Sequence, residues 1–230
     1  MRLQTDPRRR WGAAILPALA LLVPVAVAKP ALAHPHVWID ARSAVVFDSQ
    51  QRVSALRLTW RFDEFYSLFA IEGLDSNSDG RLDPAELQPL AELNVTSLKE
   101  YDYFTEILAD GEPLAFDDAR DYSSRYEEGI LSLTFEIPLA MPIDPRAARV
   151  RFRSYDPTFY IAIEPALQDP VAFAGTPPPS CRAVVEEDSA PPEVLTLSEA
   201  DFADPAASQS IGKLYATTLA ILCESAGMTQ

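Results

Sequence analysis

One stretch near the middle of the chain, from Asp75 to Glu86, constrains the fold more than any other. It reads DSNSDGRLDPAE and matches the pattern D-x-[DN]-x-[DN]-G-x5-E at every fixed position. In loops of this pattern, oxygen atoms at alternate positions wrap a calcium ion, and the glycine permits a sharp turn between them. The pattern requires a helix on each side of the loop. The sequence therefore predicts a helix–loop–helix unit here, whatever surrounds it.

The oxygen donors that this loop would offer to calcium follow the spacing of the pattern. Side chains at alternate positions and a bidentate glutamate in the second helix supply most of them, and one backbone carbonyl completes the set. The predicted calcium ligands are Asp75, Asn77, Asp79, the carbonyl of Arg81, Asp83 and Glu86. An ordinary polar turn between two helices is the alternative interpretation. Because the sequence contains a single loop of this kind, a structural role for calcium is favoured over a sensing role.

Strand-like segments lie on both sides of the helical unit. Val37–Phe47 and Arg52–Phe62 are rich in apolar residues with imperfect alternation, which is typical of strands. The pair Asp110-Gly111 predicts a tight hairpin turn, because both residues tolerate a positive φ. The apolar segment Ile211–Cys223 is expected to pack onto the strands. The other predicted strands are 129–137, 148–155, 158–164 and 181–185.

Helical character extends over residues 63–108, with a break expected near Pro89 or Asn94. Four apolar side chains in its first part fall on one helical stripe, namely Phe65, Leu68, Phe69 and Leu74. Short strands around one helical excursion predict a fold that is mostly β. The expected architecture is β-sandwich-like with a helical EF-hand-type insertion at 63–108, and hence α+β overall.

The first 33 residues have the organisation of a secretory signal peptide. A basic segment precedes an apolar run from Trp11 to Ala28, and Ala31-Leu32-Ala33 follows as a small-residue cleavage signal. A membrane anchor is the alternative, but two prolines interrupt a run that is already short for a membrane span. We expect residues 1–33 to be removed on export and residues 34–230 to form a single periplasmic domain.

Charge and cysteine content limit the partners of the exported chain. Without the leader, 14 Lys and Arg face 33 Asp and Glu, a formal net charge of −19. Such a chain is unsuited to nucleic acid or anionic membranes, which need cationic side chains, and it is suited to cations. The two cysteines, Cys181 and Cys223, are expected to form a disulfide in an oxidising compartment. Free thiols that act as metal ligands are the alternative.

Both histidines of the chain, His34 and His36, lie directly after the predicted cleavage point. Cleavage after Ala33 would free the α-amine of His34, so that this amine and its imidazole can chelate one ion. In an extended chain, His36 and Asp40 share a face with His34. Nitrogen-rich sites of this kind suit Ni²⁺, Co²⁺, Zn²⁺ or Cu²⁺. Asp40 is the weaker of the three candidate ligands, and two solvated histidines ahead of the first strand are the alternative.

No catalytic motif is evident. The sequence lacks a Gly-x-Ser-x-Gly nucleophile motif and a Gly-rich phosphate loop, so no enzymatic activity is expected. Two functions remain: a periplasmic binding protein that delivers or buffers a transition metal, and a calcium-stabilised interaction module that docks on a membrane partner. Loss of transition-metal binding on substitution of His34 and His36, with calcium binding retained, would distinguish them.

Five segments resemble the domain-of-unknown-function 1007 family over nearly the whole exported chain. They are HPHVWID, LTWRFDEFYS, DSNSDGRLDPAEL, YDYFTEILADGE and GKLYATTLAILC. Members are exported proteins often labelled as the periplasmic component of an ABC-type transport system, and they are often encoded beside nickel/cobalt or zinc transporters. The resemblance implies an accessory role in periplasmic metal handling for an inner-membrane transporter. It also implies that His34 and His36 are the metal ligands and that 75–86 is the calcium loop.

Overall fold

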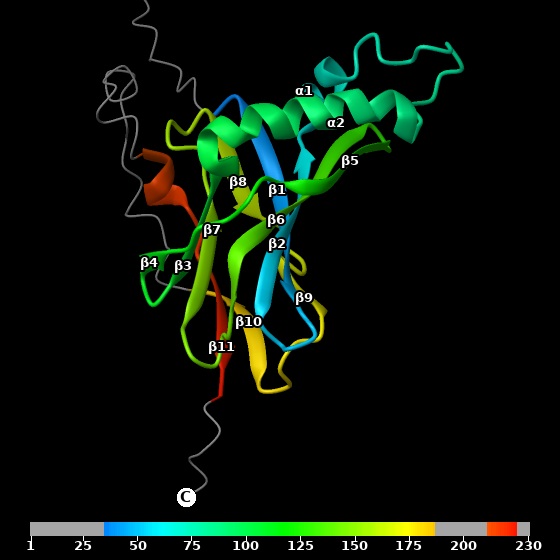
Figure 1. Cartoon of the computed structure of the whole chain (residues 1–230). Helices are drawn as coiled ribbons and strands as arrows, with labels where there is room; N and C mark the ends of the chain where they lie inside the picture. Colours follow the sequence, from blue (N-terminus) through cyan, green and yellow to red (C-terminus); the bar gives the residue numbers. More distant parts are fainter. Residues whose placement is uncertain (1–34, 187–210, 225–230) are drawn as a thin grey trace, which may run out of the picture. The chain divides into compact units, whose positions relative to one another are not determined.

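Two β-sheets, one helical segment and a short helical stretch at 211–215 make up the part of the chain that the computed structural model describes, residues 35–186 and 211–224 (Figure 1). The predicted leader and His34 lie outside these residues. The helical elements are α1 (Glu64–Ala70), α2 (Pro84–Leu98) and the 3₁₀ segment η1 (Lys99–Phe104). The strands are β1 (Val37–Phe47), β2 (Val53–Phe62), β3 (Thr105–Ala109), β4 (Glu112–Pro113), β5 (Arg120–Glu127), β6 (Ile130–Ile143), β7 (Val150–Ser154), β8 (Ile161–Pro165), β9 (Val171–Gly175), β10 (Cys181–Val185) and β11 (Leu219–Cys223).

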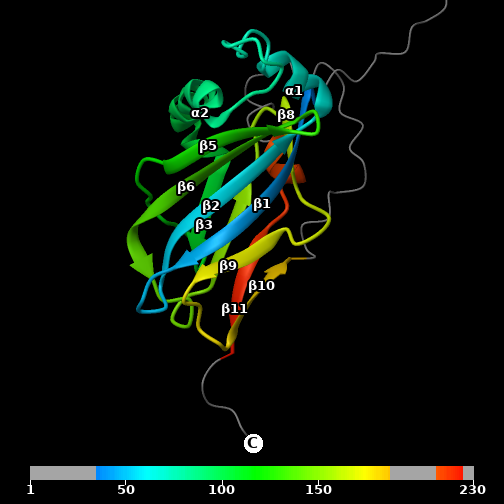
Figure 2. The same cartoon turned by 90° about the vertical axis from the view of Figure 1, so that its right-hand side faces the viewer.

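The larger sheet is built around β1. Its strand order is β5-β6-β2-β1-β8, and β9 also pairs with β1. β1 runs antiparallel to β2, while β8 and then β9 pair with it in parallel along its first and second halves (Figure 2). The smaller sheet has the order β10-β11-β7-β3-β4. The predicted fold that is mostly β and α+β overall is confirmed.

Alternation along the strands creates the core. In β1 every second side chain is buried, from Val37 to Phe47. In β2 and β6 the buried residues include Trp60 and Phe135, whose rings meet edge to face at 5.1 Å. Side chains of both sheets contribute to one apolar cluster, for example Val45 of β1 and Phe152 of β7. Burying each large apolar side chain contributes about 1.5–3 kcal/mol, so this shared cluster holds the two sheets together.

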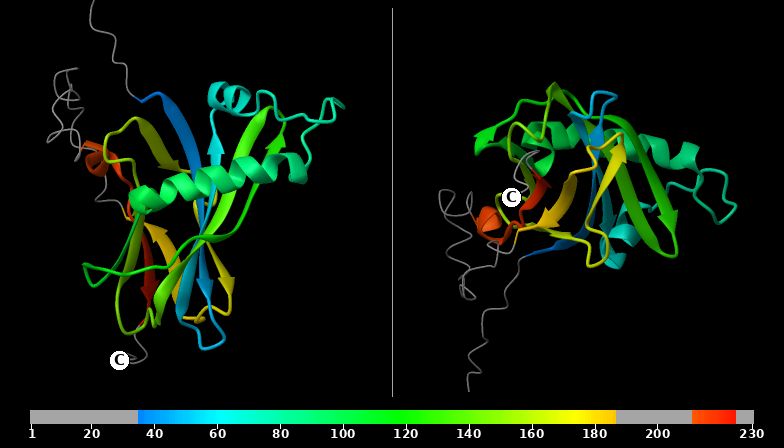
Figure 3. Two further views of the ribbon diagram at one scale, coloured as in Figure 1. Left: turned by 45° about the horizontal axis from the view of Figure 1, so that its top comes forward. Right: turned by 90° about the horizontal axis from the view of Figure 1, so that it is seen from below.

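α2 lies across the strands at one end of the larger sheet (Figure 3). Its buried residues Leu87, Ala91 and Val95 are spaced four apart, so they form one stripe toward the core. The predicted break near Pro89 or Asn94 is wrong, because α2 is a single helix through both residues. Pro89 removes one backbone hydrogen bond, and burial of the apolar stripe outweighs that loss. Strand β3 then begins at Thr105, so the last residues of the predicted helical segment are extended.

α1 is short and is held by polar contacts. Asp63 caps it by accepting a hydrogen bond from the Tyr66 N–H at 2.8 Å. Ser67 is its one fully buried residue. Three residues of the apolar stripe predicted from the sequence face away from the core, with Phe65 83 % and Phe69 71 % exposed and Leu68 also exposed, whereas Leu74 packs against the core. Among the described residues, no helix is long and apolar enough to cross a membrane.

The hairpin prediction at Asp110-Gly111 is confirmed. These residues join β3 to β4 with φ of 51° and 94°, the two positive values that a type I′ turn requires. The predicted disulfide between Cys181 and Cys223 is also confirmed and links β10 to β11. Both described cysteines are used in it, which removes the alternative of thiol metal ligands. Strands β5 and β9 had no clear counterpart among the sequence predictions.

Candidate functional sites

The loop that carries the calcium pattern turns back on itself through its own side chains. The Asp75 carboxylate accepts hydrogen bonds from the N–H groups of Asp79 at 3.2 Å and Gly80 at 2.9 Å. The Asn77 side-chain oxygen accepts a second bond from Asp79 N–H at 2.8 Å. Gly80 has φ of +79°, as the sharp turn at this position of the pattern requires. The side-chain oxygens of two predicted ligands, Asp75 and Asn77, are thereby turned toward the backbone of the loop.

Glu86 closes the loop from the first turn of α2. Its carboxylate accepts hydrogen bonds from the N–H of Ser76 at 2.9 Å and of Asp83 at 3.1 Å. Asp83 caps the helix in return by accepting from the Glu86 N–H at 3.0 Å, which completes a capping box. The N–H of Asp83, with help from Ser76, holds the pKa of Glu86 below its ordinary value. Glu86 is therefore a carboxylate at neutral pH.

The donor set of this loop fits calcium better than any softer metal. Every candidate ligand is a carboxylate, amide or carbonyl oxygen, which hard divalent cations prefer. Two features depart from the pattern. α1 ends at Ala70, before the loop begins at Asp75. The carboxylates bond mainly to backbone N–H groups, and within the described ranges no group of three His, Cys, Asp or Glu side chains is gathered for a metal ion.

The second candidate site lies at the start of β1. His36, Trp38 and Asp40 are exposed, while Val37 and Ile39 between them are buried, so the alternation places the three on one face as predicted. The backbone N–H of His36 donates to the carbonyl of Tyr160 at 2.9 Å. Its ring lies 4.7 Å from that of Tyr160. These two contacts fix the position of the imidazole at the surface.

Asp40 lies further along the same strand. Three residues of extended chain lie between it and His36, so four steps of about 3.3 Å place the two roughly 13 Å apart. Its neighbours are Glu164 on β8 and Arg61 on β2, which are its register partners. One ion with ligand bonds near 2 Å does not span that distance, so Asp40 and His36 are not brought together. The prediction for His34 falls on a residue outside those described.

A cavity beside α2 was not predicted from the sequence. It is open to solvent and has a volume of about 650 Å³, between the C-terminal half of α2, the inward face of the larger sheet and the loop before β8. The indole N–H of Trp60 and the side-chain N–H₂ of Asn94, two residues that line it, are buried and have no hydrogen-bond partner among the described residues. A buried donor without an acceptor costs about 1–3 kcal/mol. No local sequence signal marks this cavity, because its walls come from five separate segments.

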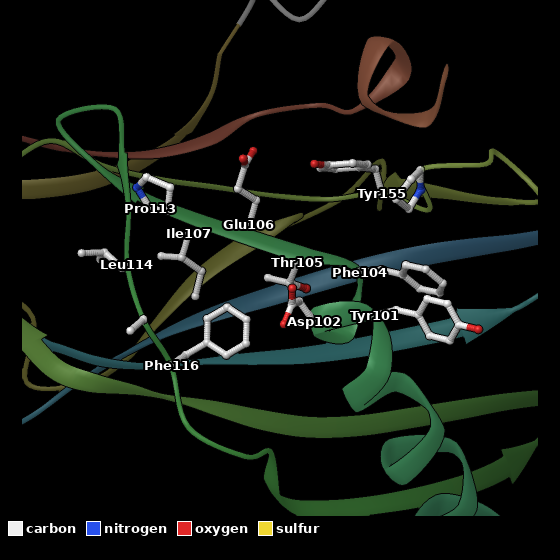
Figure 4. Close-up of a pocket in the computed structure, with 12 residues that line it drawn as sticks. Tyr101, Asp102, Phe104, Thr105, Glu106, Ile107, Pro113, Leu114, Phe116 and Tyr155 are labelled. Carbon is white, nitrogen blue, oxygen red and sulfur yellow. The ribbon is translucent and has the colours of Figure 1, made fainter. Parts of the chain in front are cut away.

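A turn with unusual backbone separates this cavity from a second one. Asp102, Tyr103 and Phe104 are consecutive residues with φ of 49°, 53° and 49°, values that non-glycine residues rarely adopt. Each costs about 1–3 kcal/mol, and such conformations cluster at functional sites. The rings of Tyr101 and Phe104 stack at 5.4 Å and line both cavities. The second cavity, of about 490 Å³, lies toward Phe116, as Figure 4 shows.

These features define a β-rich protein with an acidic oxygen-donor loop, a surface histidine at the start of β1 and an apolar cavity under one helix. The family described as "Protein of unknown function (DUF1007)" matches residues 19–223. The chain belongs to this family, and the resemblance inferred from its motifs is confirmed. It is also similar to a protein of Haemophilus influenzae titled "Uncharacterized protein". The two are 23 % identical over 208 residues, which cover 89 % of this chain and 98 % of the relative.

Proposed function

We propose that the protein is an exported, periplasmic accessory protein of a divalent transition-metal transport system. In this proposal residues 1–33 are the cleaved leader, and His34 with its freed α-amine and His36 bind Ni²⁺, Co²⁺, Zn²⁺ or Cu²⁺. The observation that carries the proposal is the placement of His36. His36 lies directly before β1, and its imidazole is exposed and held in position by Tyr160. His34 lies two residues before it in the sequence. A fixed imidazole loses little freedom when it takes a metal ion.

Charge supports the same proposal. The exported chain has a net charge of −19, which raises the local concentration of cations. Asp40 stays a prediction as an additional acidic group near the site. Because it lies too far from His36 to bind the same ion, its role in this proposal is to attract the ion rather than to coordinate it. The protein would deliver or buffer the metal for an inner-membrane transporter.

The loop 75–86 is proposed to bind Ca²⁺ as a structural clip. Its ligands would be Asp75, Asn77, Asp79, the carbonyl of Arg81, Asp83 and Glu86. What supports this is the all-oxygen donor set and the turned-back backbone with its positive φ at Gly80. Bound calcium would supply positive charge that neutralises the carboxylates and holds α1 close to α2. Glu86 would exchange its bonds with Ser76 for the ion.

Calorimetric titration tests the transition-metal site. The processed protein beginning at His34 is titrated with Zn²⁺, Ni²⁺, Co²⁺ and Cu²⁺ in saturating calcium. The matched control is the same protein with one additional residue before His34, which keeps both imidazoles and removes the free amine beside them. We expect submicromolar binding that is lost in the extended protein. Equal binding by both forms, or by the His34→Ala/His36→Ala variant, would refute the site.

A specific observation favours a second candidate function, an interaction module without a transition-metal role. Phe65, Leu68 and Phe69 present an exposed apolar surface on α1, next to the loop proposed to bind calcium. This surface would dock on a membrane partner. In cells that depend on the protein, Phe65→Ser/Phe69→Ser would then abolish function while His34→Ala/His36→Ala would not. The metal-binding proposal expects the reverse.

A further inference from the structure

α1 presents a dense group of exposed apolar side chains, which we call the α1 surface. It consists of Phe65, Leu68 and Phe69, each more than half exposed. Their spacing of three and four residues places them on one face of the helix, away from the buried Ser67. Nowhere else among the described residues do three exposed large apolar side chains fall within five positions. Figure 1 shows α1 and the loop after it at one end of the described chain. A grouped, exposed apolar patch of this kind marks an interaction surface.

The chain around the α1 surface is strongly acidic. Residues 63–86, which comprise α1, the loop and the first turn of α2, contain seven Asp and Glu against one basic residue, Arg81. Of these acids, Glu64, Glu72 and Asp79 are exposed. A calcium ion in the loop would offset only part of this charge, so the unit stays acidic with or without the ion. Apolar contacts and negative charge are therefore offered to a partner side by side.

A hollow beside the start of α1 adds an aromatic ring to these carboxylates. Its volume is about 280 Å³, and Trp38, Asp40 and Glu164 are among the residues that line it. The backbone N–H of Trp38 donates to the carboxylate of Asp63, the capping residue of α1, at 3.0 Å, so the hollow and the helix adjoin. Three carboxylates line the hollow against a single guanidinium, that of Arg61. The exposed indole of Trp38 also attracts cations, so this hollow suits a lysine or arginine side chain.

Charge narrows the choice of occupant for the α1 surface. A second copy of the exported chain, with its net charge of −19, would bring acid against acid, and an anionic bilayer would be repelled in the same way. The segment 187–210 of this chain contains six Asp and Glu and no Lys or Arg, so it has the wrong charge too. A purely apolar segment would desolvate the surrounding carboxylates without pairing them. The fitting occupant is a segment of another protein that carries both apolar and cationic side chains.

We propose that the α1 surface docks a basic amphipathic helix of a partner protein. The apolar side chains of that helix cover Phe65, Leu68 and Phe69, and its Lys and Arg side chains meet the surrounding carboxylates. A helix fits because side chains spaced three and four residues apart pack against the same spacing on a second helix. This docking rests on the second candidate function and specifies the chemistry of the partner. It uses neither histidine.

Three helix-forming peptides of equal length test the proposal on the chain that begins at His34, which lacks the basic and apolar leader. The first has Leu on one face and Lys on the other, the second has Leu and Glu, and the third has Ala and Lys. We expect only the Leu/Lys peptide to bind, with an affinity that falls as salt is added. Its binding should shift the backbone amide resonances of α1 and leave those of β3 and β7 in place. Phe65→Ser/Phe69→Ser should weaken it by about tenfold or more, because docking buries both rings.

Control variants separate docking on α1 from general attraction of a cationic peptide to an acidic chain. Met141→Ser/Leu167→Ser removes two exposed apolar side chains elsewhere, leaves the charge unchanged and should keep the native affinity. Equal binding of the Ala/Lys peptide, or undiminished binding by Phe65→Ser/Phe69→Ser, would show charge attraction alone and overturn the proposal. Because both Phe side chains are exposed, that variant should keep its Tm.

The second candidate function and the proposed partner chemistry can fail separately. If no peptide binds and Phe65→Ser/Phe69→Ser still abolishes function in cells, the surface is an interaction site but the basic helix is excluded. Vesicles of phosphatidylglycerol provide the remaining comparison. Their binding by the native chain, with loss in Phe65→Ser/Phe69→Ser and no peptide bound, would assign the α1 surface to a membrane and overturn the proposal.

Discussion

The buried hydroxyl of Ser67 is predicted to contribute more to stability than any other single polar group on α1. It donates to the carbonyl of Asp63 at 2.6 Å and accepts from the N–H of Leu131, on β6, at 2.9 Å. Ser67→Ala removes both bonds and leaves the Leu131 N–H buried without an acceptor. The lost bond costs about 1 kcal/mol and the orphaned donor about 1–2 kcal/mol more, so the free energy of unfolding should fall by about 2–3 kcal/mol. For a chain of this size, that lowers Tm by roughly 5–10 °C.

A second buried serine provides a matched control. Ser124 on β5 is 3 % exposed, but its hydroxyl has no partner among the described residues. Ser124→Ala therefore removes an uncompensated polar group, and stability should stay unchanged or rise slightly. Urea unfolding followed by circular dichroism measures both variants, with an unchanged m value as the check on two-state behaviour. Equal destabilisation of the two variants, or a Ser67→Ala effect below about 0.5 kcal/mol, would refute this account of α1.

Three further predictions concern the loop, a buried ion pair and the disulfide. If the loop binds calcium, the ion at one hundred times its Kd should add about 2.7 kcal/mol of stability; Glu86→Gln should abolish the gain and Arg81→Ala should keep it, because the carbonyl remains. Burial opposes ionisation of Glu136, but hydrogen bonds from Arg120 and Arg57 outweigh it and lower its pKa below the ordinary 4.5. The stability that ionised Glu136 contributes is fully present above pH 4.5 and is lost as the pH falls through its lowered pKa. Glu136→Gln should therefore flatten the acid limb of a curve of Tm against pH. Cys181→Ser/Cys223→Ser should lower the free energy of unfolding by about 3–4 kcal/mol in the chain-entropy model, and an equal effect of reductant on this variant and the native chain would contradict it.

Much of the β structure was predictable because its determinants are local. Alternation marks β1 and β2 within one residue of their observed bounds, since each has one face in the core. The Asp110-Gly111 turn and the capping residues Asp83 and Glu86 likewise act through neighbours in sequence. The strand β9 was missed because it is short and only partly buried, so it lacks a strong pattern.

What depends on tertiary contacts was not predictable. Pro89 suggested a helix break, yet packing of Leu87, Ala91 and Val95 keeps α2 continuous. The spacing of Phe65 and Phe69 indicated one stripe of a helix, but it could not tell that both side chains are exposed. The cavity depends on side chains from β1, β2, α2 and the loop before β8. No pattern within a single segment reports how those segments meet.

The weak attachment of α1 gives the proposed calcium site a measurable consequence. A seven-residue helix is far too short to be stable alone; Ser67 is the one fully buried residue of α1, and Tyr66 and Ala70 are partly buried against the core. Its order therefore depends on these contacts, on the Asp63 cap, on the Ser67 bonds to Asp63 and Leu131, and on the loop that follows. An ion bound by Asp75 and Glu86 would join the end of α1 to the start of α2 and restrict both. Calcium should then slow amide hydrogen exchange most in α1 and the loop, by about tenfold or more, and hardly at all in β2 or β6. Uniform slowing across the sheet would show that calcium acts on global stability alone, and no change in α1 would exclude the clip.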